Sequence, residues 1–292
     1  MKAGKEQVFR QNNRFRQRSV KDMLAYAAIY ICTGMTVMIL IGIIIYILVR
    51  GLGQIRPEFL TTVTSVLRGT VGIFGNIVNT LYIVLLSMVI AAPVGIGAAI
   101  YLNEYAKPGR LVTIIEFATE TLSGIPSIIY GLFGMLFFGQ TLGLGFSLIT
   151  GSFTLILMVL PLITRNTQEA LKTVPDSYRQ GAIGLGAGKW HMIRTVLLPS
   201  AIPGILTGIV LSVGRIISES AALLFTAGSA KKVAESVFNS GGSLTVQLYL
   251  SATSEGDFDT AFGIAVILIV LVLVINQLTK ILAKRLDNTH TA

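Results

Sequence analysis

The stretch RNTQEALKTVPDSYRQGAIGLGAGKWHMIRTVLLPS, residues 165–200, interrupts a chain that is otherwise dominated by long apolar runs. It is polar, it carries four closely spaced glycines, and an apolar run lies on each side of it. If those runs cross a membrane, the stretch becomes the largest connection available to a partner protein. Its role therefore depends on the class of protein and on the side of the membrane where it lies.

The composition predicts an integral membrane protein. Hydrophobic residues make up 53% of the 292 residues, charged residues make up 13%, and the mean hydropathy is +0.75. Since a soluble domain carries about 25% charged residues, this chain has too few polar side chains to cover a globule. Several windows also exceed the roughly 18 apolar residues expected of a transmembrane helix.

The residue types that serve catalysis and metal binding are sparse in this chain. The single Cys32 lies inside an apolar run, and the two histidines, His191 and His290, are far apart. We therefore expect no disulfide framework and no metal site. No set of nucleophile and base appears, and the glycines of residues 165–200 do not form a GxxxxGK[ST] phosphate loop. The chain is expected to be neither an enzyme nor a nucleotide-binding protein, and to hold no cofactor of its own.

Six apolar segments predict six transmembrane helices and an all-α membrane protein. The expected spans are residues 23–49, 76–102, 112–138, 146–164, 202–227 and 261–283. The basic residues 1–22 precede a first span that is too long for the core of a signal peptide, so we interpret this span as a retained anchor. Gly124 and Pro126 interrupt the third span, either as a kink that affects only packing or as a wall of a transport pathway.

The distribution of positive charge predicts the orientation. With both termini in the cytoplasm, the inward segments carry 17 of the 23 Lys and Arg residues and the outward loops carry five. Positive residues mark cytoplasmic loops, so residues 165–200 are expected on the cytoplasmic side of a multi-pass membrane protein. The net charge of +9 is then a signal of topology and does not indicate nucleic acid. The outward segment 228–260 is either a solvated connection or holds a short helix or a docking surface.

The fifth apolar run contains the polar residues that are most typical of a transport site. On one continuous helix, seven small or polar residues fall within an arc of roughly 80°. They are Gly204, Gly208, Ser212, Arg215, Glu219, Ala222 and Thr226. Small residues permit close helix packing, whereas a charge at mid-membrane costs on the order of 3 kcal/mol and must face protein or water.

Two interpretations of this stripe stay open. Arg215 and Glu219, four residues apart, form a structural ion pair, or Ser212, Arg215, Glu219 and Thr226 line a pathway for an anion. The planar guanidinium of Arg215 suits a tetrahedral oxyanion, since it donates two parallel hydrogen bonds. Glu219 would hold Arg215 when the pathway is empty, or accept a hydrogen bond from a protonated oxyanion such as phosphate near neutral pH.

The polar stretch 165–200 predicts a docking element. Pro175 followed by Asp176 and Ser177 is typical of a helix start, and the glycines that follow bend the backbone or leave it approachable. At these residues the chain resembles the permeases of importer-type ABC transporters, whose cytoplasmic signature reads E-A-A-x3-G-x9-I-x-L-P. The matching residues are Gln180-Gly181-Ala182, Gly186, Val196 and Leu198-Pro199, with Gln180, Gly181 and Val196 departing from the signature.

The resemblance to ABC importer permeases implies a type I (MetI-like) architecture, with a permease domain over residues 70–283. It also implies that the stretch 165–200 is a coupling loop to a cytoplasmic ATPase. The residues it assigns to this contact are Asp176, Tyr178, Arg179, Gln180, Gly181, Ala182, Gly186 and Pro199.

Further motifs are similar to the PstA family of phosphate importer permeases. They are YLNEY at 101–105, GIPSIIYGLFG at 124–134, Gly214-Arg215 with Glu219, LLFTA at 223–227 and LTVQLY at 244–249. This resemblance implies a heterodimer with a PstC-like permease, two PstB-like ATPases that bind ATP and Mg, and a PstS-like phosphate-binding protein outside. In that family the arginine that matches Arg215 is tied to phosphate passage. The alternatives are a permease for another oxyanion or a phosphonate, and an ion-driven secondary transporter, which would need no docking loop.

Overall fold

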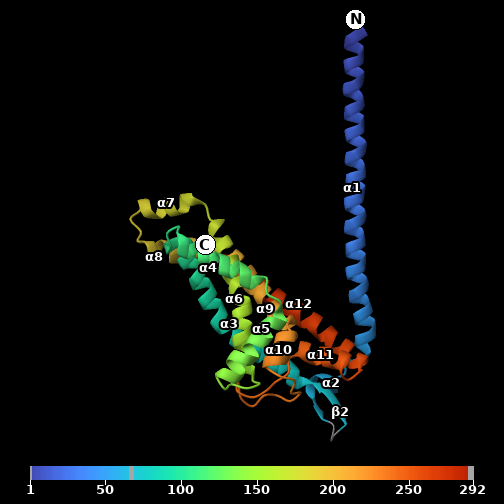
Figure 1. Ribbon diagram of the computed structural model, residues 1–292, viewed down its shortest axis with the longest axis vertical. Coiled ribbons are helices and arrows are strands. Elements are labelled where there is room, and N and C mark those ends of the chain that lie inside the picture. The colour runs from blue at the N-terminus through green and yellow to red at the C-terminus, as the bar shows by residue number, and fades with distance from the viewer. Residues whose placement is uncertain (1, 66–68, 289–292) are drawn as a thin grey trace. The chain divides into compact units, whose positions relative to one another are not determined.

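The computed structural model describes residues 2–65 and 69–288. The chain divides into two compact units, Met1–Arg50 and Gly51–Ala292 (Figure 1). The first unit belongs to a single helix, α1 (Lys2–Gly51), so the predicted tail 1–22 and anchor 23–49 share one continuous helix. The side chains of residues 1–21 lie outside the described ones, whereas those of residues 22–46 are exposed and mostly apolar.

The second unit is helical apart from one two-stranded antiparallel sheet. Its strands pair Val63 with Ile73 and Ser65 with Thr70. In chain order the elements are a 3-10 turn (Leu52–Gln54), α2 (Pro57–Thr61), β1 (Val63–Ser65), β2 (Thr70–Ile73), α3 (Phe74–Ile100) with a π-helical continuation (Tyr101–Tyr105), α4 (Arg110–Ser123), α5 (Ser127–Gly134) with a π-helical continuation (Met135–Thr141), α6 (Leu148–Lys172), α7 (Asp176–Gly184), α8 (Lys189–Met192) with a π-helical continuation (Ile193–Leu197), α9 (Leu198–Ser218), α10 (Ala221–Thr226), α11 (Leu244–Thr253) and α12 (Phe258–Asn288).

The described residues contain five helical segments that are long and apolar enough to cross a membrane, or six if one bent pair counts as a span. This confirms the all-α membrane class and the expected six spans. The bent pair joins α4 to α5 and its continuation through an angle of 102°. The bend lies at Gly124–Pro126, where proline lacks a backbone N–H and disfavours a helical conformation of the residue before it. The predicted break of the third span is therefore confirmed.

The fifth apolar run is also broken, and here the prediction of one continuous helical stripe to Thr226 is wrong. Helix α9 ends at Ser218, and Glu219 adopts an extended conformation (φ −80°, ψ 124°). One oxygen of the Glu219 carboxylate accepts a hydrogen bond from the backbone N–H of Ala222 at 3.1 Å, near the start of α10. A side chain that supplies this bond at a helix start competes with continuation of the preceding helix.

Helix α6 is the centre of the packing, with α3 and α9 against it. The predicted close-packing face of the fifth run is confirmed at its first two glycines. A Cβ atom on Gly204 would meet Ala170, and one on Gly208 would lie 2.7 Å from the Asn166 Cβ. Since any side chain here would push α9 away from α6, these glycines set the distance between the two helices.

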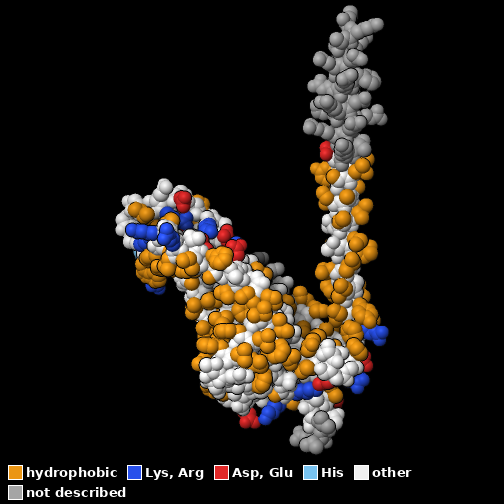
Figure 2. Space-filling view, viewed as in Figure 1, with side chains coloured by type: hydrophobic (Ala, Val, Ile, Leu, Met, Phe, Trp, Pro, Cys, Tyr) orange, Lys and Arg blue, Asp and Glu red, His pale blue; other side chains and the backbone are white. Residues whose placement is uncertain are grey.

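The two ends of the second unit are polar and its middle is apolar. We call the end that carries α7 and α8 the α7 end, and the opposite end the β2 end (Figure 1). Figure 2 shows hydrophobic side chains over the middle of the unit and Lys and Arg gathered over α7 and α8. Because α6 continues to Lys172 and α8 begins at Lys189, the connection between them is shorter than the predicted 165–200.

Candidate functional site

The break between α9 and α10 brings two of the predicted pathway residues to one place. Arg215 lies in the last turn of α9 and Glu219 follows its end, and both side chains are half-buried. Of the two interpretations left open, the ion pair between Arg215 and Glu219 is not formed in the described residues, because the Glu219 carboxylate accepts from the Ala222 N–H near the start of α10. Within residues 2–65 and 69–288, the Arg215 guanidinium has neither an ion pair nor a hydrogen bond, so it is available to a ligand or to another chain.

Two residues that the sequence interpretation did not assign to the site lie beside this break. Thr245, in α11, donates a 2.7 Å hydrogen bond from its hydroxyl to the Glu219 carbonyl oxygen. Tyr130, in α5, is close enough to Arg215 for an electrostatic interaction, and its hydroxyl donates to the Leu122 carbonyl oxygen at 2.8 Å. Both residues belong to motifs quoted above, so the signal was present, but it did not show which motifs meet in space.

The other two predicted pathway residues are packed inside the chain. Ser212 and Thr226 are fully buried. Their hydroxyls donate to carbonyl oxygens one turn earlier, Ser212 to Gly208 at 2.8 Å and Thr226 to Ala222 at 2.7 Å. Contact of these hydroxyls with substrate stays a prediction that this conformation does not support.

Helices α5 and α10 are held against each other by glycines of the 124–134 motif. A Cβ atom on Gly131 would lie 2.8 Å from the Ala222 Cα, and one on Gly134 would meet Thr154 and Thr226. Only glycine permits backbones to approach this closely without displacement. Helices α5 and α10 are therefore tightly packed beside the break that follows Arg215, and we call Tyr130, Arg215, Glu219 and Thr245 the Arg215 group.

The predicted coupling residues form a second group at the α7 end. Pro175 precedes α7, as expected, and Gly186 adopts φ +81°, a conformation that favours glycine. Exposed positions are Asp176, Tyr178, Gln180, Gly181 and Gly186, whereas Pro199 is half-buried at the start of α9. Ala182 is buried in a cluster with Leu171, Ile193 and Leu197, so it packs α7 against the rest of this chain and does not face a partner.

Large apolar side chains are exposed on α7 and α8, although the α7 end as a whole is polar. Leu185 is 90% exposed and Trp190 is 60% exposed, with Tyr178 and Ile183 also exposed. A Cβ atom on Gly181, Gly184 or Gly188 would meet nothing within 4 Å, so the backbone of α7 is open to approach. Exposed aromatic and apolar side chains around an accessible backbone are typical of a protein-binding surface.

Arg179 differs from its neighbours because its side chain turns inward. Its guanidinium donates to the Glu104 Oε1 at 2.9 Å, to the Asp176 Oδ1 at 3.0 Å, and to the carbonyl oxygens of Val174 and Leu171 at 3.0 Å each. The hydrogen bond to Glu104 raises the pKa of Arg179 above its ordinary value, against the opposing effect of burial. Glu104 was quoted in the sequence as part of a motif, but its partner lies 75 residues away.

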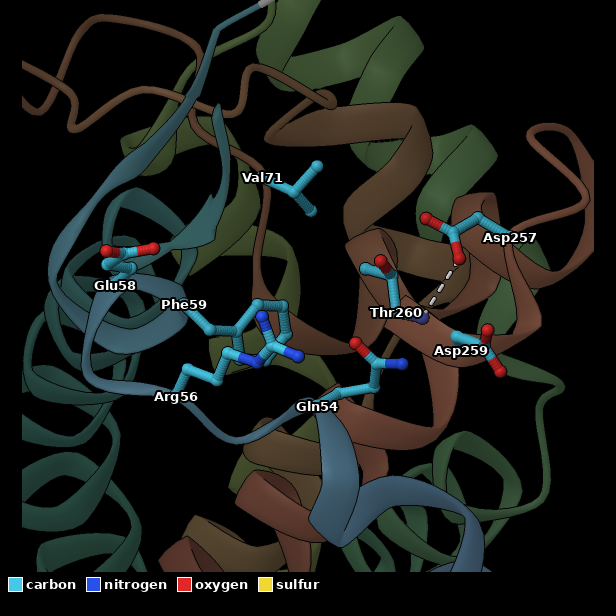
Figure 3. A pocket seen from close by; sticks show the side chains of 8 residues that line it. All are labelled: Gln54, Arg56, Glu58, Phe59, Val71, Asp257, Asp259 and Thr260. Carbon is cyan, nitrogen blue, oxygen red and sulfur yellow. Dashed lines mark hydrogen bonds between the residues drawn. The ribbon is translucent and has the colours of Figure 1, made fainter. Parts of the chain in front are cut away.

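A polar pocket of about 370 Å³ lies at the β2 end (Figure 3). Arg56, Glu58 and Phe59 lie on one side of it, and Asp257, Asp259 and Thr260 lie on the other. The Asp257 Oδ1 accepts a hydrogen bond from the Thr260 N–H at 3.0 Å, near the start of α12. Throughout the described part of the chain, none of the four charged residues forms an ion pair within 4.0 Å.

Comparison with known proteins identifies the family. Residues 91–288 match the family "Binding-protein-dependent transport system inner membrane component". The chain belongs to this family. It is 38% identical over 211 residues to the probable ABC transporter permease protein YqgI of Bacillus subtilis, with 72% of each chain covered. It is 36% identical over 205 residues to the phosphate transport system permease protein PstA of Xylella fastidiosa, with 70% of this chain and 71% of that protein covered.

A solved structure shows the same fold. The crystal structure of a bacterial alginate ABC transporter in complex with alginate pentasaccharide-bound periplasmic protein contains a chain with a TM-score of 0.69 and 17% identity. The similarity covers 91% of this chain and 96% of that one. The type I ABC importer permease architecture is thereby confirmed.

Membership of this family also determines the kind of protein. An ABC permease is a multi-pass subunit of the inner membrane that transports, and is not an enzyme. It acts together with another permease subunit, with ATPases and with a substrate-binding protein. The Arg215 group and the exposed surface of α7 are the candidate sites for the substrate and for a partner subunit.

Proposed function

We propose that this permease is the PstA-like transmembrane subunit of an ATP-driven inorganic phosphate importer. The resemblance to PstA motifs and the identity to PstA of Xylella fastidiosa support phosphate as the substrate. In this proposal the chain pairs with a PstC-like permease, two PstB-like ATPases bind ATP and Mg, and a PstS-like protein delivers phosphate outside. Both termini lie in the cytoplasm, consistent with the excess of positive residues in the inward segments.

The observation that carries the proposal is the unpaired Arg215 in an apolar helix bundle. An arginine within a span is costly unless it faces protein, water or a ligand. Since the described residues supply no ion pair or hydrogen bond for its guanidinium, the cost of placing this charge in a span must be offset by a bound anion or by the partner permease. A phosphate oxyanion satisfies it through two parallel hydrogen bonds to the planar guanidinium. In this role Arg215 is a pathway ligand, and Glu219 shapes the break that presents it.

The proposed role of α7 is to dock on the ATPase. Its exposed surface, formed by Tyr178, Ile183, Leu185 and Trp190, lies at the end that the charge distribution predicts to be cytoplasmic. Gln180 and Gly181 lie on the same exposed part of the chain. Docking on this surface would move α7, and the contacts of Arg179 and Ala182 tie α7 to the spans.

The test of this proposal is phosphate uptake by an Arg215→Gln variant in the complete transporter. We expect uptake to fall roughly 10- to 100-fold, since a hydrogen bond to a charged group contributes about 1.5–3 kcal/mol, while co-purification with the ATPase is unchanged. Competition by sulfate and by phosphonates, measured on the unaltered transporter, establishes which oxyanion is preferred.

Arg165→Gln is the matched control for this experiment. It also removes one arginine, but Arg165 is 58% exposed and forms an exposed ion pair with Glu120 at 3.7 Å. Its uptake should equal that of the unaltered transporter, because such a pair contributes little. Normal uptake with Arg215→Gln would remove Arg215 from the pathway, and uptake without the ATPase would contradict the importer class.

A further inference from the structure

We propose that α3 is the element that couples the ATPase-docking helix α7 to the β2 end of the permease, and that the ion pair between Glu104 and Arg179 is the joint that engages it. The inference rests on the proposed function, since it says how movement of α7 reaches the rest of the permease. It assigns a positioning role to Glu104, a residue that touches neither the substrate nor the proposed ATPase surface. Three sets of contacts carry the inference, one at each end of α3 and one at the α9–α10 break.

The joint at the α7 end is buried and specific. The Glu104 side chain is 6% exposed and the Arg179 side chain is 19% exposed, with 2.9 Å between Oε1 and Nη2. The Asn103 side-chain amide donates to the same Glu104 oxygen at 2.7 Å. Separating this buried pair would leave two uncompensated charges. The ion pair therefore holds α7 against the π-helical continuation of α3.

Two further contacts reinforce this joint. The Lys189 ammonium, at the start of α8, lies 4.9 Å from the centroid of the Tyr105 ring, a distance typical of a cation–π interaction. Ala182 of α7 belongs to the apolar cluster against which Ile96 and Ile100 of α3 pack. The YLNEY motif at 101–105 therefore contacts α7 through the ion pair and α8 through the Tyr105 ring, and α3 adds apolar contact through Ile96 and Ile100.

Helix α3 is suited to carry a displacement over the length of the unit. It runs for 27 residues, from Phe74 to Ile100, which corresponds to roughly 40 Å at 1.5 Å per residue. It packs along α6, and a Cβ atom on Gly95 would lie 2.8 Å from the Ile163 Cγ2. This close packing supports the helix just beyond Pro93, where one helical hydrogen bond is missing.

At the β2 end, three buried polar side chains of α3 hold the segment that follows α10. The Asn79 side chain donates to the Lys232 carbonyl oxygen at 3.0 Å and accepts from the Ala234 N–H at 3.0 Å. Asn76 donates to the Gly242 carbonyl oxygen at 2.9 Å, and the Thr80 hydroxyl accepts from the Leu244 N–H at 2.9 Å. A shift of α3 must therefore move residues 232–244 or break buried hydrogen bonds.

That segment leads back to the proposed pathway. It continues into α11, where the Thr245 hydroxyl donates to the Glu219 carbonyl oxygen at 2.7 Å. Glu219 forms the break beside Arg215. The continuous helical stretch Lys189–Ser218, which begins at α8, also leads to Arg215. The route through α3 reaches the β2 end through the side-chain hydrogen bonds of Asn76, Asn79 and Thr80, and an external binding protein would meet the permease at that end.

The experiment compares ATP hydrolysis by the complete transporter with and without phosphate-loaded binding protein. The transporter is reconstituted in proteoliposomes with its partner permease, its ATPase and the binding protein. Glu104→Gln keeps the size of the side chain and removes its charge, and Glu104→Ala removes the side chain. We expect stimulation by the loaded binding protein to fall roughly tenfold in Glu104→Ala and less in Glu104→Gln, with hydrolysis in its absence and co-purification of the subunits unchanged.

Glu169→Gln is the matched control, because Glu169 is 64% exposed and pairs with Lys172 at 3.4 Å at the same end of the unit. Its stimulation should equal that of the unaltered transporter. Thr80→Val tests the other end of α3, since it removes the acceptor for the Leu244 N–H and keeps the shape of the side chain. We expect Thr80→Val to lower the stimulation of ATP hydrolysis. We expect the double variant Glu104→Gln with Thr80→Val to lose no more stimulation than the stronger single variant, because both substitutions interrupt the same route.

The inference is overturned if Glu104→Gln and Glu104→Ala both assemble and are stimulated as strongly as the Glu169→Gln control. It is also overturned if the fold-losses of stimulation caused by Glu104→Gln and Thr80→Val multiply in the double variant. If Glu104→Ala does not assemble, Glu104→Gln decides alone by the same criterion. Failure of the proposed function is a separate result, because it shows as absence of phosphate uptake by the unaltered transporter.

Discussion

The two arginines of the functional groups differ in what surrounds them. Arg179 donates to four oxygens within 3.0 Å, whereas Arg215 has no such partner in the described residues. Because the hydrogen bond to Glu104 raises the pKa of Arg179, the stability that this pairing contributes is fully present below the ordinary pKa of arginine and is lost only as the pH rises through the raised pKa. Arg179 thus has a structural role, whereas the proposed role of Arg215 is to bind a ligand.

At Glu219, the effect of the side-chain charge can be measured separately from the effect of its hydrogen bond to the backbone. Glu219→Gln keeps an oxygen that accepts from the Ala222 N–H, and Glu219→Ala loses it. We expect Glu219→Ala to lower stability by about 1 kcal/mol, as loss of a helix cap does, and Glu219→Gln to leave it unchanged. Thermal unfolding of the purified complex measures this difference.

The charge of Glu219 is then tested by transport through the Gln variant. If the carboxylate accepts a hydrogen bond from protonated phosphate, Glu219→Gln lowers phosphate uptake and weakens the preference for phosphate over sulfate. Uptake and selectivity equal to those of the unaltered transporter would leave Glu219 with the capping role alone.

At the scale of elements, two interrupted helices meet. The elbow between α4 and α5 and the break between α9 and α10 pack through Gly131 against Ala222. Irregular backbone within a membrane is tolerated where protein or a cavity surrounds it; here Gly124 and Pro126 at the elbow are exposed, whereas Glu219 at the break is half-buried. Their meeting places Tyr130, Arg215 and Glu219 in one region of the bundle.

The docking surface of α7 gives a prediction at the same scale. Leu185→Asp places a charge on the most exposed apolar residue of this surface. We expect affinity for the ATPase to fall about tenfold or more, since an apolar anchor would become a buried unpaired charge. Titration of purified ATPase against the permease complex in detergent measures the change.

Leu142→Asp is the control for that substitution, because Leu142 is also exposed, at 54%, and lies in a segment predicted to face outward. It should bind the ATPase normally. Equal affinity of the Leu185 and Leu142 variants would show that α7 docks through other residues.

At the scale of the whole molecule, the charge distribution predicts the orientation in the membrane. The single Cys32 is exposed on α1, so Cys32→Ser provides a background without cysteine. In that background Ser177→Cys lies on α7, and Glu235→Cys lies in the segment after α10, and both positions are exposed. We expect a membrane-impermeant maleimide added to intact cells to label position 235, and to label position 177 only after the membrane is opened.

The opposite labelling pattern would reverse the orientation and would place α7 outside. That result would contradict the positive-inside distribution and would also remove the ATPase as the partner of α7. Labelling of both positions in intact cells would instead indicate a damaged membrane, which the accessibility of a soluble cytoplasmic protein detects.

The spans and the interruption at Gly124–Pro126 were predictable because their causes are local. Hydropathy over about 18 residues and the missing N–H of Pro126 act within a few turns of the chain. The end of α9 was not predictable in the same way. Residues 215–226 keep a helical pattern of small and polar residues, whereas the Glu219 carboxylate accepts from the Ala222 N–H and the Glu219 carbonyl oxygen accepts from Thr245 of α11.

By itself the sequence determined the membrane class, the six apolar spans, the short helix after Pro175 and the small-residue face at Gly204 and Gly208. These features depend on composition and on periodicity within single segments. Only the tertiary structure decided that Arg215 has no ion pair or hydrogen bond among the described residues, that Thr245 reaches Glu219, and that Glu104 binds Arg179 across 75 residues. Contacts of that kind depend on which helices pack together, and a single sequence does not show which distant residues meet when they pack.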